Sequence, residues 1–437
     1  MTTSAFSRRT LLSGLGAVAG AGLLGGALTA CNSGGAGGGD GTFSFLTWDA
    51  AEGSPLATAV TKWAESTGTT LDLQNVPGGD DFEAKLRTVL ASGAPPELIR
   101  INDDYVKGYF AEGSLLDLKP YLDKDGIKPE DYYPVAFNFA KQPGGEHAAW
   151  PIMTNPGVIY VNVDAFEEAG IDLPSTDWND DGWTWDDFLA AAKELNRPGE
   201  RYGCLVFPDT SLETVFTTSN GSDGIYSKDG TRFTLAEGPG AEAVQWVADL
   251  ALKHKVHPDF ATITAGENTP NWQQSQLGTG KVAMMLALTS SVPWLRENAT
   301  VNWDIRPVPK KVSRTTVNTM TVLAIPKDSK DPDKAWEFLK YCVGEEASAA
   351  FAKSRGFIPV SKSAGALFEP DDKAPENLPV AIDALDHAVN ENFSEYIQQA
   401  RGVYRPVLDD VWSGKRTAAD ALGSVADQVN AILAGQG

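Results

Sequence analysis

Strand-like and helix-like patterns alternate along the chain from residue 42 to residue 101. Alternating apolar positions indicate strands, whereas apolar positions three and four residues apart indicate helices. Ser54 and Pro55 supply the N-cap and first position of one helix, which Gly68 ends. Because strands flank each helix, we expect parallel βαβ units, an α/β fold and a doubly wound sheet. The strand-like runs are residues 42–48, 71–73 and 98–101, and the helix-like runs are residues 55–67 and 81–92.

Polar and aromatic side chains follow the first and third of these strands. In doubly wound sheets, ligands bind beyond the carboxyl ends of the strands. Trp48 and Asp49 follow the first strand, and we expect them to contact a ligand. Asn102, Asp103 and Tyr105 follow the third strand, and we expect the same of them. The alternatives are a core position for Trp48 and turn formation or helix capping for the polar residues.

Length and charge narrow the domain organisation and the partners. The chain has 437 residues, and roughly 400 remain after a leader of 30, which exceeds one hydrophobic core and predicts two domains. The formal net charge is −22 for the whole chain. Removing the leader, whose only charges are two arginines, makes it −24. A surface this acidic repels nucleic acid and anionic lipid headgroups, so we expect neither as a partner.

The first 41 residues have the layout of a targeting segment. Arg8 and Arg9 precede an apolar run rich in glycine and alanine, and residues 28–31 (LTAC) close it. The arginine pair resembles a twin-arginine signal, and residues 28–31 resemble a bacterial lipobox. Residues 1–30 are therefore predicted to be a signal peptide, Cys31 an acylated N-terminus and residues 31–41 a flexible tether. An uncleaved transmembrane helix is the alternative.

Few residues of the chain point to metal or cofactor chemistry. After Cys31 only Cys204 and Cys342 remain, and they are either one disulfide or two buried thiols. None of the four histidines has a cysteine or carboxylate at metal-ligand spacing, so we expect no metal. Neither a phosphate-binding loop nor a serine-nucleophile elbow occurs, and we expect no cofactor and no enzymatic activity.

Three later segments carry local signals. Proline and glycine within residues 154–157 interrupt an extended run over residues 148–162 and predict a bend or a crossing point instead of one continuous central strand. Thr184 and Asp187 have the spacing of a helix capping box. Thr417 is predicted to cap one final helix with apolar residues in register to residue 432.

Several blocks together resemble the extracellular solute-binding proteins of ATP-driven sugar importers, the maltose and multiple-sugar group. Each block is short, but their order and spacing over residues 42 to about 365, behind a lipobox, make the resemblance specific. The blocks are residues 90–97 (LASGAPPE), 112–118 (EGSLLDL), 158–166 (VIYVNVDAF), 184–188 (TWDDF), 280–285 (GKVAMM), 293–294 (PW) and 325–330 (IPKDSK).

The resemblance implies a two-lobed periplasmic-binding-protein-like fold of type II, with a ligand cleft between lobes that crossing strands join. It places the N-lobe at residues 42–154 plus 320–366, and the C-lobe at residues 155–319 plus 367–437. Two positions depart from the family pattern. Val292 stands where a glycine often precedes the Pro-Trp pair, and residues 318–320 replace a usual glycine pair.

Further ligand contacts follow from this comparison and from residue chemistry. Sugars bind through hydroxyl groups and through C–H faces that lie on aromatic rings. Trp294 matches the family's cleft tryptophan, and Asn155 and Thr319 lie at the two crossings. Trp272 precedes a polar loop, and Arg355 carries a guanidinium that suits a hydroxyl pair or a carboxylate. Core packing, a turn and a surface salt bridge are the respective alternatives for the tryptophans, Asn155 and Arg355.

The resemblance implies a monomeric substrate-binding component of an ABC importer. Such a protein captures a sugar or oligosaccharide by hinge closure and delivers it to membrane permease subunits. Its predicted location is the extracytoplasmic face of the bacterial cell membrane, held there by the lipid anchor. The alternatives are a secreted glycoside hydrolase and a binder of a polyol, a glycerophosphate or a peptide.

Overall fold

The computed structural model describes residues 42–206, 210–267 and 269–436. Within them the strands form one mixed sheet, in the order β2-β1-β3-β8-β4-β6-β5. Off this path, β7 and β9 pair with β4, and β10 pairs with β8. The strands are β1 (Thr42–Thr47), β2 (Thr70–Asn75), β3 (Leu98–Ile101), β4 (Trp150–Asn162), β5 (Tyr202–Val206), β6 (Val282–Leu288), β7 (Trp303–Arg306), β8 (Thr316–Ala324), β9 (Ile358–Pro359) and β10 (Ala388–Val389).

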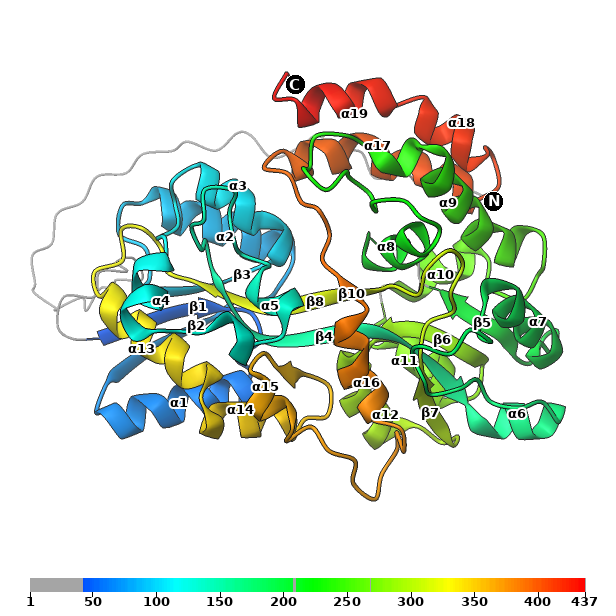
Figure 1. Cartoon of the computed structure of the whole chain (residues 1–437), viewed down its shortest axis with the longest axis horizontal. Coiled ribbons are helices and arrows are strands. Elements are labelled where there is room, and N and C mark those ends of the chain that lie inside the picture. Colours follow the sequence, from blue (N-terminus) through cyan, green and yellow to red (C-terminus); the bar gives the residue numbers. More distant parts are fainter. Residues whose placement is uncertain (1–41, 207–209, 268, 437) are drawn as a thin grey trace, which may run out of the picture. The chain divides into compact units, whose positions relative to one another are not determined.

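Helices cover the sheet on both sides (Figure 1). The α-helices are α1 (Pro55–Thr67), α2 (Asp80–Ala91), α3 (Val106–Ala111), α4 (Lys119–Asp125), α5 (Pro134–Phe137), α6 (Val163–Ala169), α7 (Trp185–Leu195), α8 (Thr210–Ser219), α9 (Gly238–Leu252), α10 (Phe260–Glu267), α11 (Trp272–Gly278), α12 (Val292–Asn298), α13 (Pro332–Val343), α14 (Glu345–Ala352), α15 (Lys362–Gly365), α16 (Pro379–Asp383), α17 (Ile397–Trp412), α18 (Ala418–Gly423) and α19 (Ala426–Leu433).

The predicted alternation of strands and helices at the start of the fold is confirmed. β1 pairs in parallel with β2 and with β3, as two βαβ units require. The Ser54 side chain accepts a hydrogen bond from the Ala57 backbone N–H, and Gly68 ends α1 in the left-handed conformation with φ 66°. The apolar face of α1 packs Trp63 against Phe43, with ring centroids 5.0 Å apart. Local signals therefore set these elements, and aromatic packing fixes them on the sheet.

The later local signals give one confirmation and two corrections. The capping box at Thr184 and Asp187 is present, with Asp187 N–H donating to Thr184 Oγ1 over 3.2 Å. The single helix expected after Thr417 is wrong, because the chain forms two helices, α18 and α19, with a break between them. The expected interruption at residues 154–157 is also wrong, since β4 is one continuous strand of 13 residues. The alternative, a crossing point, is found there, because β4 pairs with β8 up to Pro156 and with β6 from Gly157.

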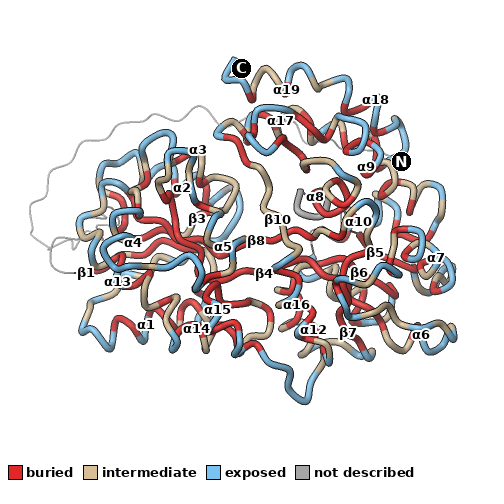
Figure 2. Tube along the Cα trace, viewed as in Figure 1, coloured by how far each residue is buried: buried red, intermediate tan, exposed pale blue. Residues whose placement is uncertain are grey.

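β4 and β8 are long strands that join two separate hydrophobic cores. The first half of β4 pairs with β8, and from Gly157 onward β4 pairs with β6 and β7 instead. Figure 2 shows both strands buried along their length where they pass between the two cores. One core contains β1 and α13, and the other contains β6 and α17. The fold is the two-lobed α/β class expected from the sequence.

Candidate functional site

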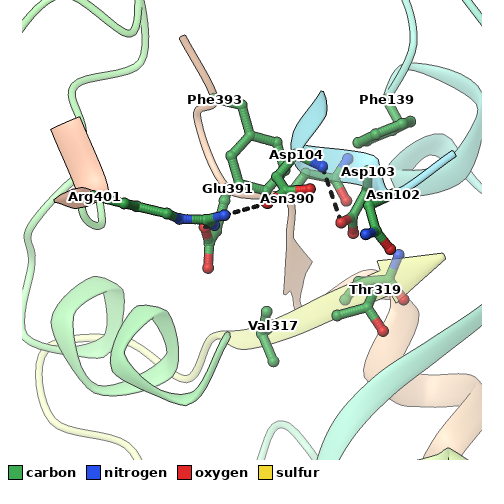
Figure 3. Close-up of a pocket in the computed structure, with 11 residues that line it drawn as sticks. Asn102, Asp103, Asp104, Phe139, Val317, Thr319, Asn390, Glu391, Phe393 and Arg401 are labelled. Carbon is green, nitrogen blue, oxygen red and sulfur yellow. Dashed lines mark hydrogen bonds and ion pairs between the residues drawn. The ribbon is translucent and has the colours of Figure 1, made fainter. Parts of the chain in front are cut away.

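A cavity of about 250 Å³ lies where β8 passes between the two cores. The turn after β3 lines one side, and residues 390–401 line the opposite side (Figure 3). Val317 and Thr319, both on β8, also line the cavity. The lining residues are Asn102, Asp103, Asp104, Phe139, Val317, Asn318, Thr319, Asn390, Glu391, Phe393 and Arg401.

The turn after β3 supplies an acidic pair to this cavity. β3 ends at Ile101, Asn102 stays extended, and Asp103–Tyr105 form a 3₁₀ turn, η1. The Asp104 backbone N–H donates to Asp103 Oδ1 over 3.0 Å, which restrains the Asp103 side chain. This is the carboxyl end of the strand, where the sheet topology predicts a ligand.

The crossing strands supply amides and a hydroxyl group. Asn155 on β4 lies opposite Thr319 on β8, and its Nδ2 donates to Thr319 Oγ1 over 2.6 Å. Asn318 Oδ1 accepts a hydrogen bond from Thr154 Oγ1. The Asn318 side chain is only 3% exposed, and its Nδ2 has no partner within the described part of the chain. A buried amide donor without a partner is costly, so it is a natural contact for an acceptor on a ligand.

The C-terminal region brings a second set of polar groups to the cavity. β10 pairs in parallel with β8, which carries Asn390 to the crossing. Asn390 Nδ2 donates to the backbone oxygen of Val135 over 2.7 Å. Its Oδ1 is buried and has no hydrogen bond among the described residues. Asn390 is therefore held against α5 by its amide nitrogen, and its Oδ1 remains available to accept a hydrogen bond from a ligand.

An ion-pair network connects the two sides directly. Arg401 Nη1 contacts Asp104 Oδ2, and Arg401 Nη2 lies 3.8 Å from Glu391 Oε2. Glu391 also accepts a hydrogen bond from Thr214 Oγ1 over 3.0 Å. Burial lowers the pKa of Arg401, but Asp104, Tyr404 and Glu391 outweigh that effect and the pKa lies above its ordinary value. The arginine is therefore held as a cation by groups of the protein itself.

Asp103 is the carboxyl group of the cavity without a direct ion pair in the described chain. Burial raises its pKa to about 7, and the negative charge of Asp104 adds to the rise. The Asp104 backbone N–H, Arg401 and Arg100 act in the opposite direction and compensate only in part. Arg100 itself is bound to Asp49. At neutral pH the Asp103 carboxyl can therefore either donate or accept a hydrogen bond.

These groups match the chemistry of a polyhydroxylated ligand. Asn318 Nδ2 is a donor, while Asp104 Oδ1 and Asn390 Oδ1 are acceptors, and each lacks a partner within the described residues. Phe139 and Phe393 add apolar faces to the lining. Hydroxyl groups satisfy donors and acceptors alike, and the C–H face of a sugar ring covers aromatic carbon.

The structure brings some of the sequence-predicted residues together here. Asn102, Asp103 and Thr319 line the cavity, and Asn155 supports it through Thr319. Trp48 and Asp49 lie beside it and hold Arg100 between them. The Arg100 guanidinium lies 3.9 Å from the Trp48 ring centroid and is ion-paired with Asp49.

The other candidates lie outside this lining, and their contact with a ligand stays a prediction. Tyr105 stacks on Tyr109, with ring centroids 6.1 Å apart. Trp272 and Trp294 are partly buried against the core that contains β6. Arg355 donates to two backbone oxygens and lies 3.6 Å from Asp371 Oδ2, as a structural arginine does.

Sequence reasoning missed the C-terminal side of the cavity. The cavity is lined there by Asn390, Glu391, Phe393 and Arg401, which precede the predicted final helix and carry no predicted ligand contact. The signal that could have located them is β10, the short extended run just before Asn390. A strand-like stretch among helices indicates pairing with a distant strand. β10 is only two residues long, which is too short for a periodicity argument.

Further structural facts concern the cysteines, possible metal-ligand groups and membrane-spanning helices. Cys204 and Cys342 are free and buried in different cores. Burial raises the pKa of both thiols. No group of three potential metal ligands occurs in the described chain. Among the described residues, no helix is both long and apolar enough to cross a bilayer. Cys31 and the predicted leader and tether lie outside the described residues.

Comparison with known proteins places these features in one family. The profile of the bacterial extracellular solute-binding protein family matches residues 47–349. A Brucella abortus (strain 2308) protein, named only as a binding protein, is 27% identical over 307 residues, which is 68% of this chain and 70% of its own. The sn-glycerol-3-phosphate-binding periplasmic protein UgpB of Escherichia coli (strain K12) is 23% identical over 381 residues, covering 81% and 84%.

A solved structure confirms the fold. An ABC substrate-binding protein of Listeria monocytogenes, in complex with cycloalternan, superposes with a TM-score of 0.78 at 21% identity. The match covers 90% of this chain and 99% of that one.

Proposed function

The chain belongs to the family of bacterial extracellular solute-binding proteins, and we propose that it captures a sugar or oligosaccharide as the substrate-binding component of an ABC importer. The cavity between the cores carries this proposal, because unpartnered donors and acceptors there lie beside two phenylalanines. At about 250 Å³ the cavity is below the roughly 300 Å³ at which pockets for drug-sized ligands begin, so a short ligand suits it best.

Capture proceeds by closure of two lobes around the ligand. We propose the N-lobe at residues 42–154 plus 320–366 and the C-lobe at residues 155–319 plus 367–437. The hinge then lies where Asn155 pairs with Thr319. Ligand favours the closed form because only there do both lobes contact it, and this difference in affinity shifts the population.

The predicted leader and tether complete the proposal. Cleavage after residue 30 and acylation of Cys31 hold the mature protein, as a monomer, on the outer face of the cell membrane. One acyl chain binds a membrane only marginally, so a diacylglyceryl anchor is needed. From there the closed form docks on the permease subunits. Membrane fractionation of a Cys31→Ser variant tests the anchor, and unchanged membrane association would contradict it.

Thermal unfolding with candidate ligands tests the function. The protein from Gly41 onward is melted against a panel of mono- and oligosaccharides, polyols, glycerol 3-phosphate and peptides. Ligand at about 100 times its dissociation constant adds about 2.7 kcal/mol to the free energy of unfolding, so the melting temperature rises by a few degrees. We expect a rise with at least one carbohydrate.

Two outcomes contradict this function. A rise with glycerol 3-phosphate or peptides but with no carbohydrate would discard the sugar and keep the binding role. Hydrolysis of a chromogenic glycoside would favour the glycosidase instead. The glycerophosphate alternative has specific support in the similarity to UgpB, which is named for sn-glycerol-3-phosphate binding.

A further inference from the structure

The lining of the cavity carries more negative than positive charge. Asp103, Asp104 and Glu391 face one cation, Arg401. That cation is already bound to Asp104 and lies near Glu391. A phosphate group in the cavity would have to compete with Asp104 and Glu391 for Arg401. It would also lie near Asp103 with no cation to offset the repulsion between them. The cavity is therefore unfavourable for an anionic ligand.

Asp103 is the group left for a positive charge. Two arginines act on Asp103, and each forms an ion pair with another carboxylate. Arg401 pairs with Asp104, and Arg100 pairs with Asp49. Asp103 takes part in no ion pair within the described residues, although it lines the cavity. A buried carboxylate is stabilised when a cation pairs with it, and a ligand can supply that cation.

Two further features suit such a ligand. Phe393 and Phe139 present rings to the cavity, and the Arg401 guanidinium lies 5.9 Å from the Phe393 ring centroid. Aromatic faces attract cations through the ring quadrupole. Asn318 belongs to the same lining and is only 3% exposed, and its Nδ2 has no partner among the described residues, so this donor suits an acceptor such as a hydroxyl oxygen.

We propose that the cleft binds a carbohydrate bearing a basic amino group, with Asp103 as the counter-charge of its ammonium. The inference rests on the proposed function, since it specifies the sugar that the same cavity takes. Asp104 and Glu391 exclude anionic forms of that sugar. Both carboxylates already share Arg401, so a further anion would have no cation left to pair with.

Calorimetric titration with matched sugars tests this proposal. The probes cover the gluco, galacto and manno configurations. Each configuration is tested as the hexose, its 2-amino-2-deoxy form, its N-acetylated form and its 6-phosphate. Dimers of the hexose, the amino form and the N-acetylated form are included. We expect at least one amino sugar to bind tenfold or more tightly than its neutral and N-acetylated counterparts. The 6-phosphates should not bind measurably. Raising sodium chloride from 50 to 500 mM should weaken the amino sugar and leave a neutral sugar unaffected.

An Asp103→Asn variant identifies the residue responsible. It should remove the preference for the amino sugar by tenfold or more, while Asp172→Asn, at an exposed carboxylate outside the lining, should retain it. The salt dependence of the wild-type protein supplies the same information if the variant does not fold.

The possible outcomes separate the two proposals. Neutral sugars that bind as tightly as amino sugars overturn the inference and keep the proposed function. Tight binding of a 6-phosphate also overturns it. If no carbohydrate of the panel binds, both proposals fail together.

Discussion

Asp103 is a carboxyl group of the cleft whose ionised form is disfavoured by its surroundings. The 3₁₀ turn after β3 places it beside Asp104, and the Asp104 backbone N–H holds it in position over 3.0 Å. Burial, followed by the charge of Asp104, raises its pKa to about 7. In the unfolded chain an aspartate titrates near 3.9, so the folded protein binds this proton more tightly.

This difference predicts a pH dependence of stability. A raised pKa means that the contribution of Asp103 is fully present below about pH 4 and is lost as pH rises to about 7. The melting temperature of the wild-type protein minus that of Asp103→Asn should therefore fall over this range and stay constant above it. The charged groups that act on Asp103 are Asp104, Arg401 and Arg100, and both proteins retain them.

Thermal melts at half-unit pH intervals measure that difference. The Asp172→Asn variant is the control for replacing one aspartate at an exposed position. A constant difference between wild type and Asp103→Asn from pH 4 to 8 would contradict the shifted titration.

At the scale of elements, the pairing of β4 with β8 determines where the hinge can lie. Gly157 is the position at which β4 changes partners. A Cβ atom there would lie 2.9 Å from Thr316 Oγ1 and 3.2 Å from Val317 Cγ1. Thr316 Oγ1 also donates to the Gly157 backbone oxygen over 2.7 Å. Glycine is needed here because the two strands approach closely, and this explains why the Pro-Gly signal did not break the strand.

Replacing that glycine should destabilise the crossing. We expect Gly157→Val to lower the free energy of unfolding by about 1–3 kcal/mol, the usual cost of overpacking. Ligand affinity should fall as well, because Val317 and Thr319 follow on the displaced strand. Urea unfolding with calorimetry measures both. Gly402→Ala, in α17 with no atom within 4 Å of the added Cβ, should not destabilise, and equal stability of both variants would refute the packing argument.

At the scale of the whole fold, two cores meet across a small number of polar contacts. Arg401 and Asp104 are 297 residues apart in sequence and form an ion pair whose side chains are 19% and 14% exposed. Asn390 adds a hydrogen bond to Val135 across the same gap. If the proposed lobes move, these contacts hold the closed form, and their loss favours the open form.

Small-angle scattering tests that expectation. The ligand-free Arg401→Gln variant should have a larger radius of gyration than wild type, because it leaves Asp104 without its cation in the closed form. Arg232→Gln is the control, as Arg232 pairs with Glu237 five residues away, within one lobe. Identical scattering from Arg401→Gln and wild type would show that this ion pair does not bias closure.

Features that depend on neighbouring residues could be predicted from the sequence. The spacing of apolar positions between Thr42 and Ile101 predicted the βαβ units, because helices and strands expose one face at a fixed period. Side chains after β3 could be assigned to a cleft, since parallel strands end at a common edge.

The residues that complete the cleft from distant parts of the chain could not be predicted, because tertiary contacts bring them there. Arg401, Glu391 and Asn390 reach it because β10 pairs with β8 and α17 packs on the second core. Trp294 was predicted from a family cleft position and Trp272 from the polar loop that follows it, and both pack partly buried against that core, outside the lining of this cavity. Pairing between strands and the approach of two lobes depend on contacts far apart in the chain, which no local pattern records.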